Sequence, residues 1–491
     1  MNARFVSLLF AASAFSACGG ESAPSGSATD GARRPTGVLL ISIDSLRADH
    51  MSCYGYESPL MPEIATTPNI DRRLAGEGTL FERVVSTTSW TVPSHMAMLS
   101  GQPDEVHGVK GTSSRLHKSR PLLAMRYRDA GWRTGGFFSG PNLHPYFGFG
   151  RGFEVYEDCT SVGVDASKFA PKNDRQRDEL RAMEDAAHRG HTGEEVVGRF
   201  QEWIETIGED ESFFAFAHFW DVHYDYEPPE EFDVFDPDYE GEVDGTNIPE
   251  LFERRLPGKE RDSLHIAALY DGEILYTDHN IDTMLDVLEA AGRLDDTLIV
   301  FTSDHGEEFG EHGRFGHNKT LYEEVVRVPL ILRHPSLVSA GLRVDDLVSL
   351  VDIAPTLLEL CGLPADGTHW GRSLVPLLRG EGLPPRAAPL SLQFGRPVPG
   401  TKRAPMEGLH AGDHKVVRNR PGEAPILFDL EADPLENEVA DVPKNDPRIR
   451  AAKRTWKNLA EEGARLPTED GELPPELEAE LTSIGYLGGD E

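Results

Sequence analysis

The stretch that decides the fold is Val38-Leu39-Leu40-Ile41-Ser42-Ile43, which is followed at once by Asp44. A nearly continuous apolar run of this length is typical of a strand that is buried on both faces of a parallel sheet. Similar runs recur at residues 212–216, 297–301 and 328–332, with a weaker candidate at 134–138. We therefore predict a central sheet in which residues 38–43 form a fully buried strand.

Segments with helical periodicity separate these runs, at residues 194–207, 262–291 and 352–360. The alternation predicts an α/β fold, a mostly parallel sheet sandwiched by helices. Ligands of such folds gather at the carboxyl ends of the strands. Asp44 and the pair Asp304-His305 each follow a predicted strand, so we expect a site there.

The pattern changes after Arg379 to short apolar segments, which predict a small antiparallel sheet in a C-terminal subdomain. Residues 224–260 are acidic, proline-rich and poorly periodic, and they predict a long surface insertion near the mouth of the site. The predicted organisation is a signal peptide (1–17), a flexible tether (18–36), a catalytic domain (37–380) and a C-terminal subdomain with its tail (381–491).

Composition excludes some partners. The 491-residue chain has a formal net charge of -35. Binding to nucleic acid or to anionic lipid headgroups requires basic patches, so we expect neither. The simplest interpretation of the charge is a solvated acidic surface.

The N-terminus carries a positive residue, a short apolar stretch and then Ser16-Ala17-Cys18-Gly19. The stretch is too short to span a bilayer and is typical of a secretion signal. Ser16-Ala17-Cys18-Gly19 resembles a bacterial lipobox, so we expect a lipid anchor at Cys18 and a location in the cell envelope, in the periplasm or at the cell surface. Simple secretion is the alternative. The other cysteines, Cys53, Cys159 and Cys361, show no paired framework.

Thr91, in Trp90-Thr91-Val92-Pro93, offers a hydroxyl at a predicted helix start, since proline favours the first helical turn. Backbone N–H groups at such a terminus attract a tetrahedral anion. A threonine hydroxyl is a poor nucleophile until a metal or a base lowers its pKa. Asp44, Asp304 and His305 could hold that metal. Taken alone, Thr91 could equally be an ordinary N-cap.

Several motifs, in the right order over residues 37–488, together resemble the sulfatase family of the alkaline phosphatase superfamily. They include Ile43-Asp44-Ser45-Leu46-Arg47, Thr67-Pro68-Asn69, the Thr91 segment ending in Leu99-Ser100-Gly101, and Asp304-His305-Gly306-Glu307 with Gly310-Glu311-His312-Gly313. The C-terminal signatures would be Phe428-Asp429-Leu430 and Ile484-Gly485-Tyr486-Leu487-Gly488.

The resemblance implies one divalent metal ion, held by Asp44, Asp304 and His305 and completed by the oxygen of Thr91. Ser45 stands where the family often has a second aspartate, and it would be a weaker ligand. A histidine among the ligands favours Zn or Mn over Ca, while the oxygen ligands keep Ca and Mg possible.

The nucleophile departs from the family pattern. Formylglycine-dependent sulfatases carry a Cys/Ser-x-Pro-x-Arg motif, whereas this chain has Thr91 and His95 at those two positions. Oxidation of a threonine would give a ketone, so the hydrated-aldehyde route to sulfate release is closed. The resemblance makes His223 the contact for the substrate anion, and His317 or Lys319 the proton donor to the leaving group.

We therefore predict a secreted metal-dependent hydrolase that cleaves phosphate or phosphonate esters through Thr91. The alternatives are a sulfuric ester hydrolase of the arylsulfatase type and an envelope transferase of phospho-headgroups. A non-catalytic glycan-binding lipoprotein is the alternative from a different class. The phosphate- or sulfate-ester substrate is not identified by the sequence.

Overall fold

The computed structural model describes residues 34–160, 191–246, 248, 260–365, 367–393, 405–420 and 422–483. The predicted signal peptide, Cys18 and most of the tether lie outside these residues, as does the predicted signature at 484–488. Within the described part of the chain, no helix combines the length and the apolar character that crossing a membrane would need.

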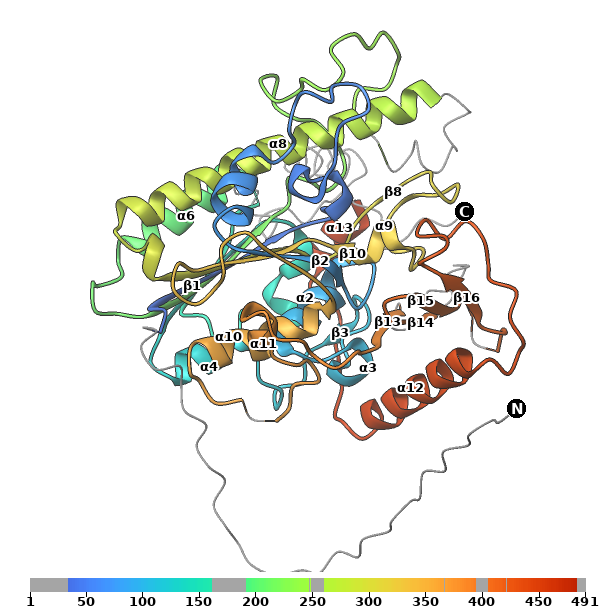
Figure 1. Cartoon of the computed structure of the whole chain (residues 1–491). Helices are drawn as coiled ribbons and strands as arrows, with labels where there is room; N and C mark the ends of the chain where they lie inside the picture. Colours follow the sequence, from blue (N-terminus) through green and yellow to red (C-terminus); the bar gives the residue numbers. More distant parts are fainter. Residues whose placement is uncertain are drawn as a thin grey trace, which may run out of the picture. The chain divides into compact units, whose positions relative to one another are not determined.

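The predicted mostly parallel central sheet is confirmed (Figure 1). Strands β7, β1, β6, β4 and β5 run parallel to one another, and β10 and β11 are antiparallel to β2. The order across the sheet is β10 (Arg327–Val328), β2 (Thr79–Val85), β11 (Leu330–Arg333), β7 (Thr297–Ser303), β1 (Gly37–Ile43), β6 (Phe213–Phe219), β4 (Arg133–Phe138) and β5 (Val155–Asp158), with β12 (Leu342–Ser349) also beside β2. The run predicted at 328–332 is split into β10 and β11 at Pro329, which has no N–H for a sheet ladder.

Strand β1 lies between β6 and β7, and all seven of its residues are buried. Its side chains alternate between two apolar cores, because successive residues of a strand point to opposite faces. Val38 and Leu40 belong to one core, and Leu39, Ile41 and Ile43 to the other. The continuous apolar run of the sequence is therefore explained by helices on both faces.

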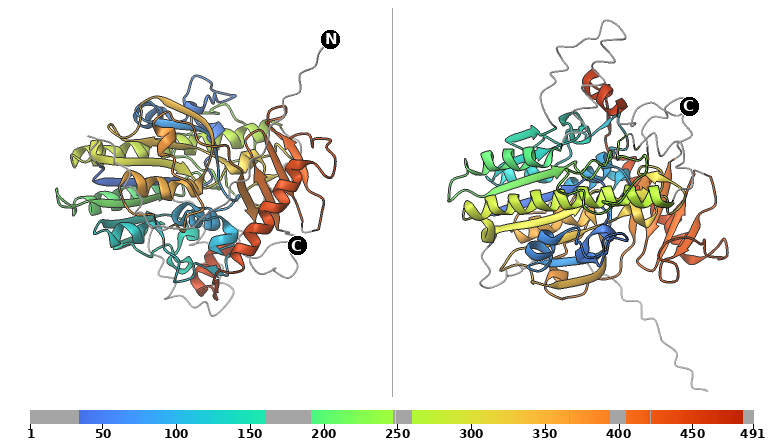
Figure 2. Two further views of the ribbon diagram at one scale, coloured as in Figure 1. Left: turned by 60° about the horizontal axis from the view of Figure 1, so that its bottom comes forward. Right: turned by 90° about the horizontal axis from the view of Figure 1, so that it is seen from above.

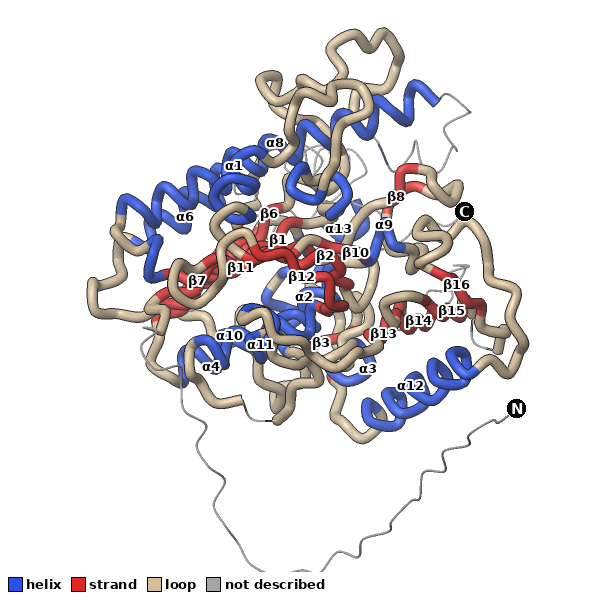
Figure 3. The backbone as a smooth tube through the Cα atoms, in the orientation of Figure 1, coloured by secondary structure: helices blue, strands red, loops and turns tan. Residues whose placement is uncertain are grey.

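The helices form two layers, one on each face of the sheet (Figures 1 and 3). One layer contains α1 (Pro68–Ile70), α6 (Gly193–Ile204) and α8 (Glu260–Ala290). The other contains α2 (Thr91–Ser100), α4 (Leu123–Asp129), α10 (Ile353–Leu360) and α11 (Val375–Leu378). The helices predicted at 194–207, 262–291 and 352–360 correspond to α6, α8 and α10, with boundaries shifted by up to three residues.

The small antiparallel sheet predicted near the C-terminus is also present, as β13 (Ala388–Leu392), β14 (Met406–His410), β15 (His414–Arg418) and β16 (Ile426–Asp429). Helix α12 (Pro447–Gly463) lies along it (Figure 2). Val416 and Leu427 of this sheet pack in one apolar cluster with Ile449 and Trp456 of the helix. The boundary at residues 380 and 381 stays a prediction.

Short elements complete the described chain. They are α3 (Asp104–His107), β3 (Ser114–Arg115), β8 (Glu308–Phe309), β9 (Phe315–Gly316), α9 (Glu323–Val326), β17 (Glu469–Asp470) and α13 (Pro475–Ser483). Residues 224–246, in the predicted surface insertion, contain neither helix nor strand. Two of their aromatic side chains, Tyr226 and Phe235, are nevertheless fully buried, so this loop also packs into the core.

Candidate active site

Asp44 and Asp304 are brought together by strand pairing. Ile43 and Ser303 are register partners in the parallel pair β1–β7, so the residue that follows each strand emerges at the same edge of the sheet. His305 completes the group, with its Nε2 3.7 Å from Asp44 Oδ1 and 3.4 Å from Asp304 Oδ2. All three side chains are fully buried. One ligand atom from each lies within 4.8 Å of the others.

Thr91 is the first residue of α2, and its hydroxyl enters this group. The Thr91 Oγ1 donates to Asp44 Oδ2 at 3.3 Å and lies 3.3 Å from His305 Nε2. Every residue of α2 is buried, and the helix ends at Gly101 in the left-handed conformation. Trp90 precedes the helix and gives it no side-chain cap, which leaves the first turn able to hydrogen-bond a ligand.

The electrostatics of the group fit a bound cation. Asp304 Oδ2 is buried and has no hydrogen-bond partner among the described residues. Burial, together with the charge of Asp44, raises the pKa of Asp304 well above its usual value. Burial acts in the same direction on Asp44, but the imidazoles of His218, His223 and His305 outweigh it and hold the pKa of that carboxyl below its usual range. Two carboxylates, one imidazole and a hydroxyl suit a divalent ion such as Zn or Mn.

Ser45 supports the carboxylates through hydrogen bonds. Its Oγ donates to Asp44 Oδ1 at 2.9 Å, and its backbone N–H donates to Asp304 Oδ1 at 3.2 Å. The backbone of Ser45 has φ of 57°, in the left-handed region that a side chain other than glycine rarely adopts. Tyr270 holds this conformation by donating from its hydroxyl to the carbonyl oxygen of Ser45 at 2.8 Å. Such local strain is often found at functional sites.

His95 is fully buried beneath the group. Its Nε2 is 2.9 Å from Ser42 Oγ, and its Nδ1 is 3.0 Å from the carbonyl oxygen of Thr91. Burial and the neighbouring His218 lower the pKa of His95 well below its usual value, so the ring is neutral. The side chain thus links β1 to the first turn of α2 and fixes the position of Thr91.

The ring of His317 lies beside that of His305, and the ring of His223 lies beside that of His317. The ring centroids of His223 and His317 are 5.0 Å apart, and the centroid of His317 is 4.5 Å from that of His305. His317 Nδ1 is 3.2 Å from both carboxylate oxygens of Glu307. Burial lowers the pKa of His223 to about 3. Lys319 is exposed, and its Nζ donates to the carbonyl oxygen of Phe315 at 2.8 Å.

The sequence interpretation gave no role to two residues of this region, His218 and Glu307. His218 Nε2 lies 3.5 Å from Asp44 Oδ2, because His218 is the register partner of Ser42 on β6. A histidine inside the apolar run Phe216-Ala217-His218-Phe219 was the available signal. Glu307 is fully buried and accepts a hydrogen bond from Tyr226 at 3.1 Å, and burial raises its pKa to about 7.

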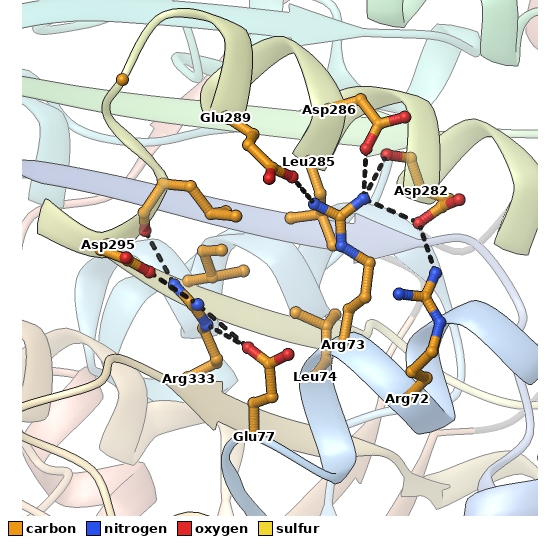
Figure 4. A pocket seen from close by; sticks show the side chains of 13 residues that line it. Arg72, Arg73, Leu74, Glu77, Asp282, Leu285, Asp286, Glu289, Asp295 and Arg333 are labelled. Atoms are coloured by element: carbon orange, nitrogen blue, oxygen red, sulfur yellow. Dashed lines mark hydrogen bonds and ion pairs between the residues drawn. The ribbon is translucent and has the colours of Figure 1, made fainter.

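A hollow of about 630 Å³ lies at the opposite edge of the sheet (Figure 4). Its lining includes Ile299 near the start of β7, whereas Asp304 follows the end of that strand. Its three arginines, Arg72, Arg73 and Arg333, are all ion-paired to carboxylates of the same hollow. The hollow therefore offers no unneutralised positive charge for an anionic ester, and the group around Thr91 remains the candidate site.

Comparisons with known proteins show the family of this chain. The chain matches the Sulfatase family over residues 36–363, and the family described as "N-sulphoglucosamine sulphohydrolase, C-terminal" over residues 310–462. It is 24% identical to the N-acetylglucosamine-6-O-sulfatase of Bacteroides thetaiotaomicron, with 82% of each chain covered. A choline-sulfatase of Rhizobium meliloti is 35% identical, over 34% of this chain and 31% of that protein.

Solved structures show the same fold. A phosphonate monoester hydrolase of Agrobacterium radiobacter superposes with a TM-score of 0.68 at 24% identity, covering 90% of this chain and 99% of that one. A structure solved in complex with its substrate D-glucosamine-2-N,6-O-disulfate superposes with a TM-score of 0.65 at 19% identity, covering 88% and 99%. The chain belongs to the sulfatase family and is an ester hydrolase of the alkaline phosphatase superfamily.

Proposed function

We propose that this protein hydrolyses phosphate or phosphonate esters with Thr91 as the nucleophile. One observation carries the proposal: the Thr91 hydroxyl lies 3.3 Å from both Asp44 Oδ2 and His305 Nε2, at the start of a helix. The family resemblance aligns Thr91 with the Cys or Ser that is converted to formylglycine in formylglycine-dependent sulfatases.

Asp44, Asp304 and His305, with the Thr91 oxygen, would hold one divalent ion. The unpartnered Asp304 Oδ2 supports this assignment, because a buried carboxylate oxygen is costly to leave unsatisfied. When bound, the ion would supply Lewis acidity and lower the pKa of the Thr91 hydroxyl. Ser45 orients both carboxylates through its hydrogen bonds rather than serving as a main ligand.

The reaction proceeds in two displacements at phosphorus. The Thr91 hydroxyl gives its proton to solvent, its oxygen attacks, a Thr–O–P bond forms, and the bond from phosphorus to the leaving oxygen breaks. The proton for that oxygen comes from His317, whose ring is held by Glu307, or from Lys319. Water then attacks phosphorus and gives a proton to the group that protonated the leaving oxygen, and the Thr–O–P bond breaks, which frees the Thr91 oxygen for the next cycle. His223 contacts the substrate anion, and His95 acts as a positioning residue for Thr91.

The nucleophile also determines which ester is favoured. A formylglycine enzyme releases sulfate when its gem-diol collapses, and that route needs an aldehyde. Thr91 cannot provide one, so attack on a sulfate ester would leave a sulfo-threonine with no comparable way to clear it. A phosphothreonine can be opened by water at phosphorus with the same residues.

The test is a panel of matched aryl phosphate monoesters, aryl phosphate diesters, aryl phosphonates and aryl sulfates. Each is assayed with protein stripped of metal and reloaded with Mg, Ca, Mn or Zn. We expect kcat/KM for at least one phosphorus ester to exceed that of the matched sulfate. A wide preference for the sulfate would reject the proposal in favour of a sulfuric ester hydrolase. Products transferred to an added alcohol instead of water would indicate a transferase.

We also propose that Cys18 is lipidated and anchors the protein in the cell envelope through a flexible tether. The support is the short apolar stretch and the Ser16-Ala17-Cys18-Gly19 motif. Mass spectrometry of the mature protein should find an acylated cysteine at its N-terminus. An unmodified Cys18, or retention of residues 1–17, would reject the anchor.

A further inference from the structure

A second group of metal-ligating side chains lies apart from Thr91, in the loop that connects β7 to β10. Glu308, His312 and Glu324 each offer a donor atom, and these atoms lie within 4.8 Å of one another. Glu308 belongs to β8, His312 lies in the turn between β8 and β9, and Glu324 belongs to the short helix α9. The group therefore brings together side chains from three segments of one connection.

Three buried side-chain atoms of this group lack hydrogen-bond partners among the described residues. Both carboxylate oxygens of Glu308 are buried and have no hydrogen-bond partner among the described residues. His312 Nε2 is also buried and has no hydrogen-bond partner among the described residues. The Thr320 hydroxyl lies close enough to Glu308 to lower its pKa slightly, but it is not in hydrogen-bonding geometry. Buried carboxylates without partners are rare in folded proteins because their desolvation is costly.

The remaining contacts hold the group in place. His312 Nδ1 lies 2.6 Å from Glu324 Oε1, and the ring stacks on Tyr322 with centroids 3.6 Å apart. The carboxylate of Glu324 lies near that of Glu308 and disfavours the charge on Glu308. Burial and the nearby Glu324 together raise the pKa of Glu308 to about 8. Such a pair needs either a proton or a cation between its members.

Glu307 and Glu308 belong to different groups although they are neighbours in the chain. Successive residues of an extended segment point to opposite sides. Glu307 faces His317 and Tyr226 beside the candidate active site, and Glu308 points to His312 and Glu324. The second group contributes no atom to the Asp44–Asp304–His305 group and is separate from it.

We propose that Glu308, His312 and Glu324 bind a second divalent transition-metal ion, Zn or Mn, in a structural role. Ligand atoms around a four-coordinate zinc are separated by roughly 3.3–3.6 Å, so small inward movements of the side chains would complete three ligands, with water as the fourth. The ion would fasten the β8–β9 hairpin to α9. Because His317 follows that hairpin directly, the site would fix the position of a residue beside the reaction without contacting substrate.

The test measures metal alone, so it does not depend on the proposed phosphorus chemistry. Asp304→Ala removes a ligand of the candidate active site, and Asp304→Ala/Glu308→Gln removes one ligand from each group. Each protein is stripped with a chelator, then titrated with Zn or Mn by calorimetry and analysed for bound metal after dialysis. We expect Asp304→Ala to bind one ion and the double variant to bind none, or at least about 100-fold more weakly.

Asp304→Ala/Glu311→Gln is the matched control. Glu311 lies in the same turn, but its carboxylate is paired with Arg47, so this variant should keep the ion. Added Zn should raise the Tm of Asp304→Ala and of the control, and should leave the Tm of Asp304→Ala/Glu308→Gln unchanged. His312→Gln in the Asp304→Ala background serves if Glu308→Gln fails to fold.

Two outcomes would overturn the proposal. One is an Asp304→Ala protein that binds no ion, which would mean that a proton alone holds the two carboxylates together. The other is equal metal binding with and without Glu308→Gln.

Discussion

The two edges of the central sheet carry opposite kinds of polar cluster. At the carboxyl edge, Asp44, Asp304 and His305 crowd together, and Asp304 Oδ2 is buried without a hydrogen-bond partner among the described residues. At the amino edge, the hollow of Figure 4 is roomy, yet its arginines are matched by carboxylates.

The two clusters differ in how they contribute to the free energy of unfolding. Paired and partly exposed charges, as at the amino edge, contribute modestly to stability and require nothing further. At the carboxyl edge, burial and the charge of Asp44 disfavour the charged form of Asp304, which therefore opposes folding until a cation joins it. Here the unsatisfied buried oxygen of Asp304, rather than the size of a hollow, points to the candidate site.

The largest expected effect is at the nucleophile. Thr91→Ala should lower kcat/KM by at least about 10³-fold, because no other hydroxyl replaces the attacking oxygen. Thr91→Ser keeps a hydroxyl and should stay within roughly tenfold of the parent protein. Kinetics on the best phosphorus ester, with metal content measured for each variant, check this. Full activity of Thr91→Ala would place the nucleophile elsewhere.

Loss of a carboxylate at the carboxyl edge should affect activity and thermal stability differently. Asp44→Ala and Asp304→Ala should each abolish activity and tight metal binding at the Thr91 site, since so small a ligand set cannot spare a charge. In metal-free protein, Asp304→Ala should raise Tm or leave it unchanged, because the repulsion between Asp304 and Asp44 is relieved. Asp44→Ala should lower Tm, because Asp44 accepts hydrogen bonds from Ser45 and Thr91 and its charge is favoured by the surrounding imidazoles. Elemental analysis and thermal unfolding measure the two effects. A large fall in the Tm of metal-free Asp304→Ala would contradict the comparison.

At the amino edge, we expect a substitution to lower stability and to leave activity unchanged. Arg333 is buried, donates to the carbonyl oxygen of Leu294 at 2.8 Å, and pairs with Glu77 and Asp295 at 3.0 Å. Arg333→Met should lower the free energy of unfolding by about 2 kcal/mol through these lost hydrogen bonds. Because the hollow is a strand length away from Thr91, kcat/KM should stay within twofold. Urea unfolding and steady-state kinetics provide the two measurements.

Arg72 gives the smallest expected effect. Its side chain is 63% exposed and pairs with Asp282 at 3.3 Å. Arg72→Ala should change the free energy of unfolding by no more than about 0.5 kcal/mol, as is usual for a surface ion pair. Activity should not change. A loss of activity in Arg72→Ala but not in Arg333→Met would instead suggest that the hollow receives a substrate group.

Much of the fold could be predicted because its signals are local. The apolar run at 38–43 required burial on both faces, and the two cores that share β1 supply it. Asp44, Thr91, Asp304 and His305 were also nominated from the sequence, since a strand end and a proline in a first helical turn limit where such residues can lie. The short segments after residue 380 were identified as an antiparallel sheet for the same reason.

Other features depend on contacts between distant segments, and sequence spacing does not encode them. The register of β1 with β6 places His218 beside Asp44, and the opposite directions of Glu307 and Glu308 divide them between two groups. The sequence by itself determined which segments form strands and helices, because periodicity and apolar burial act over a few residues. Only the tertiary structure decided which buried carboxylates crowd together and which are neutralised by arginines, because charge pairing depends on distance in space.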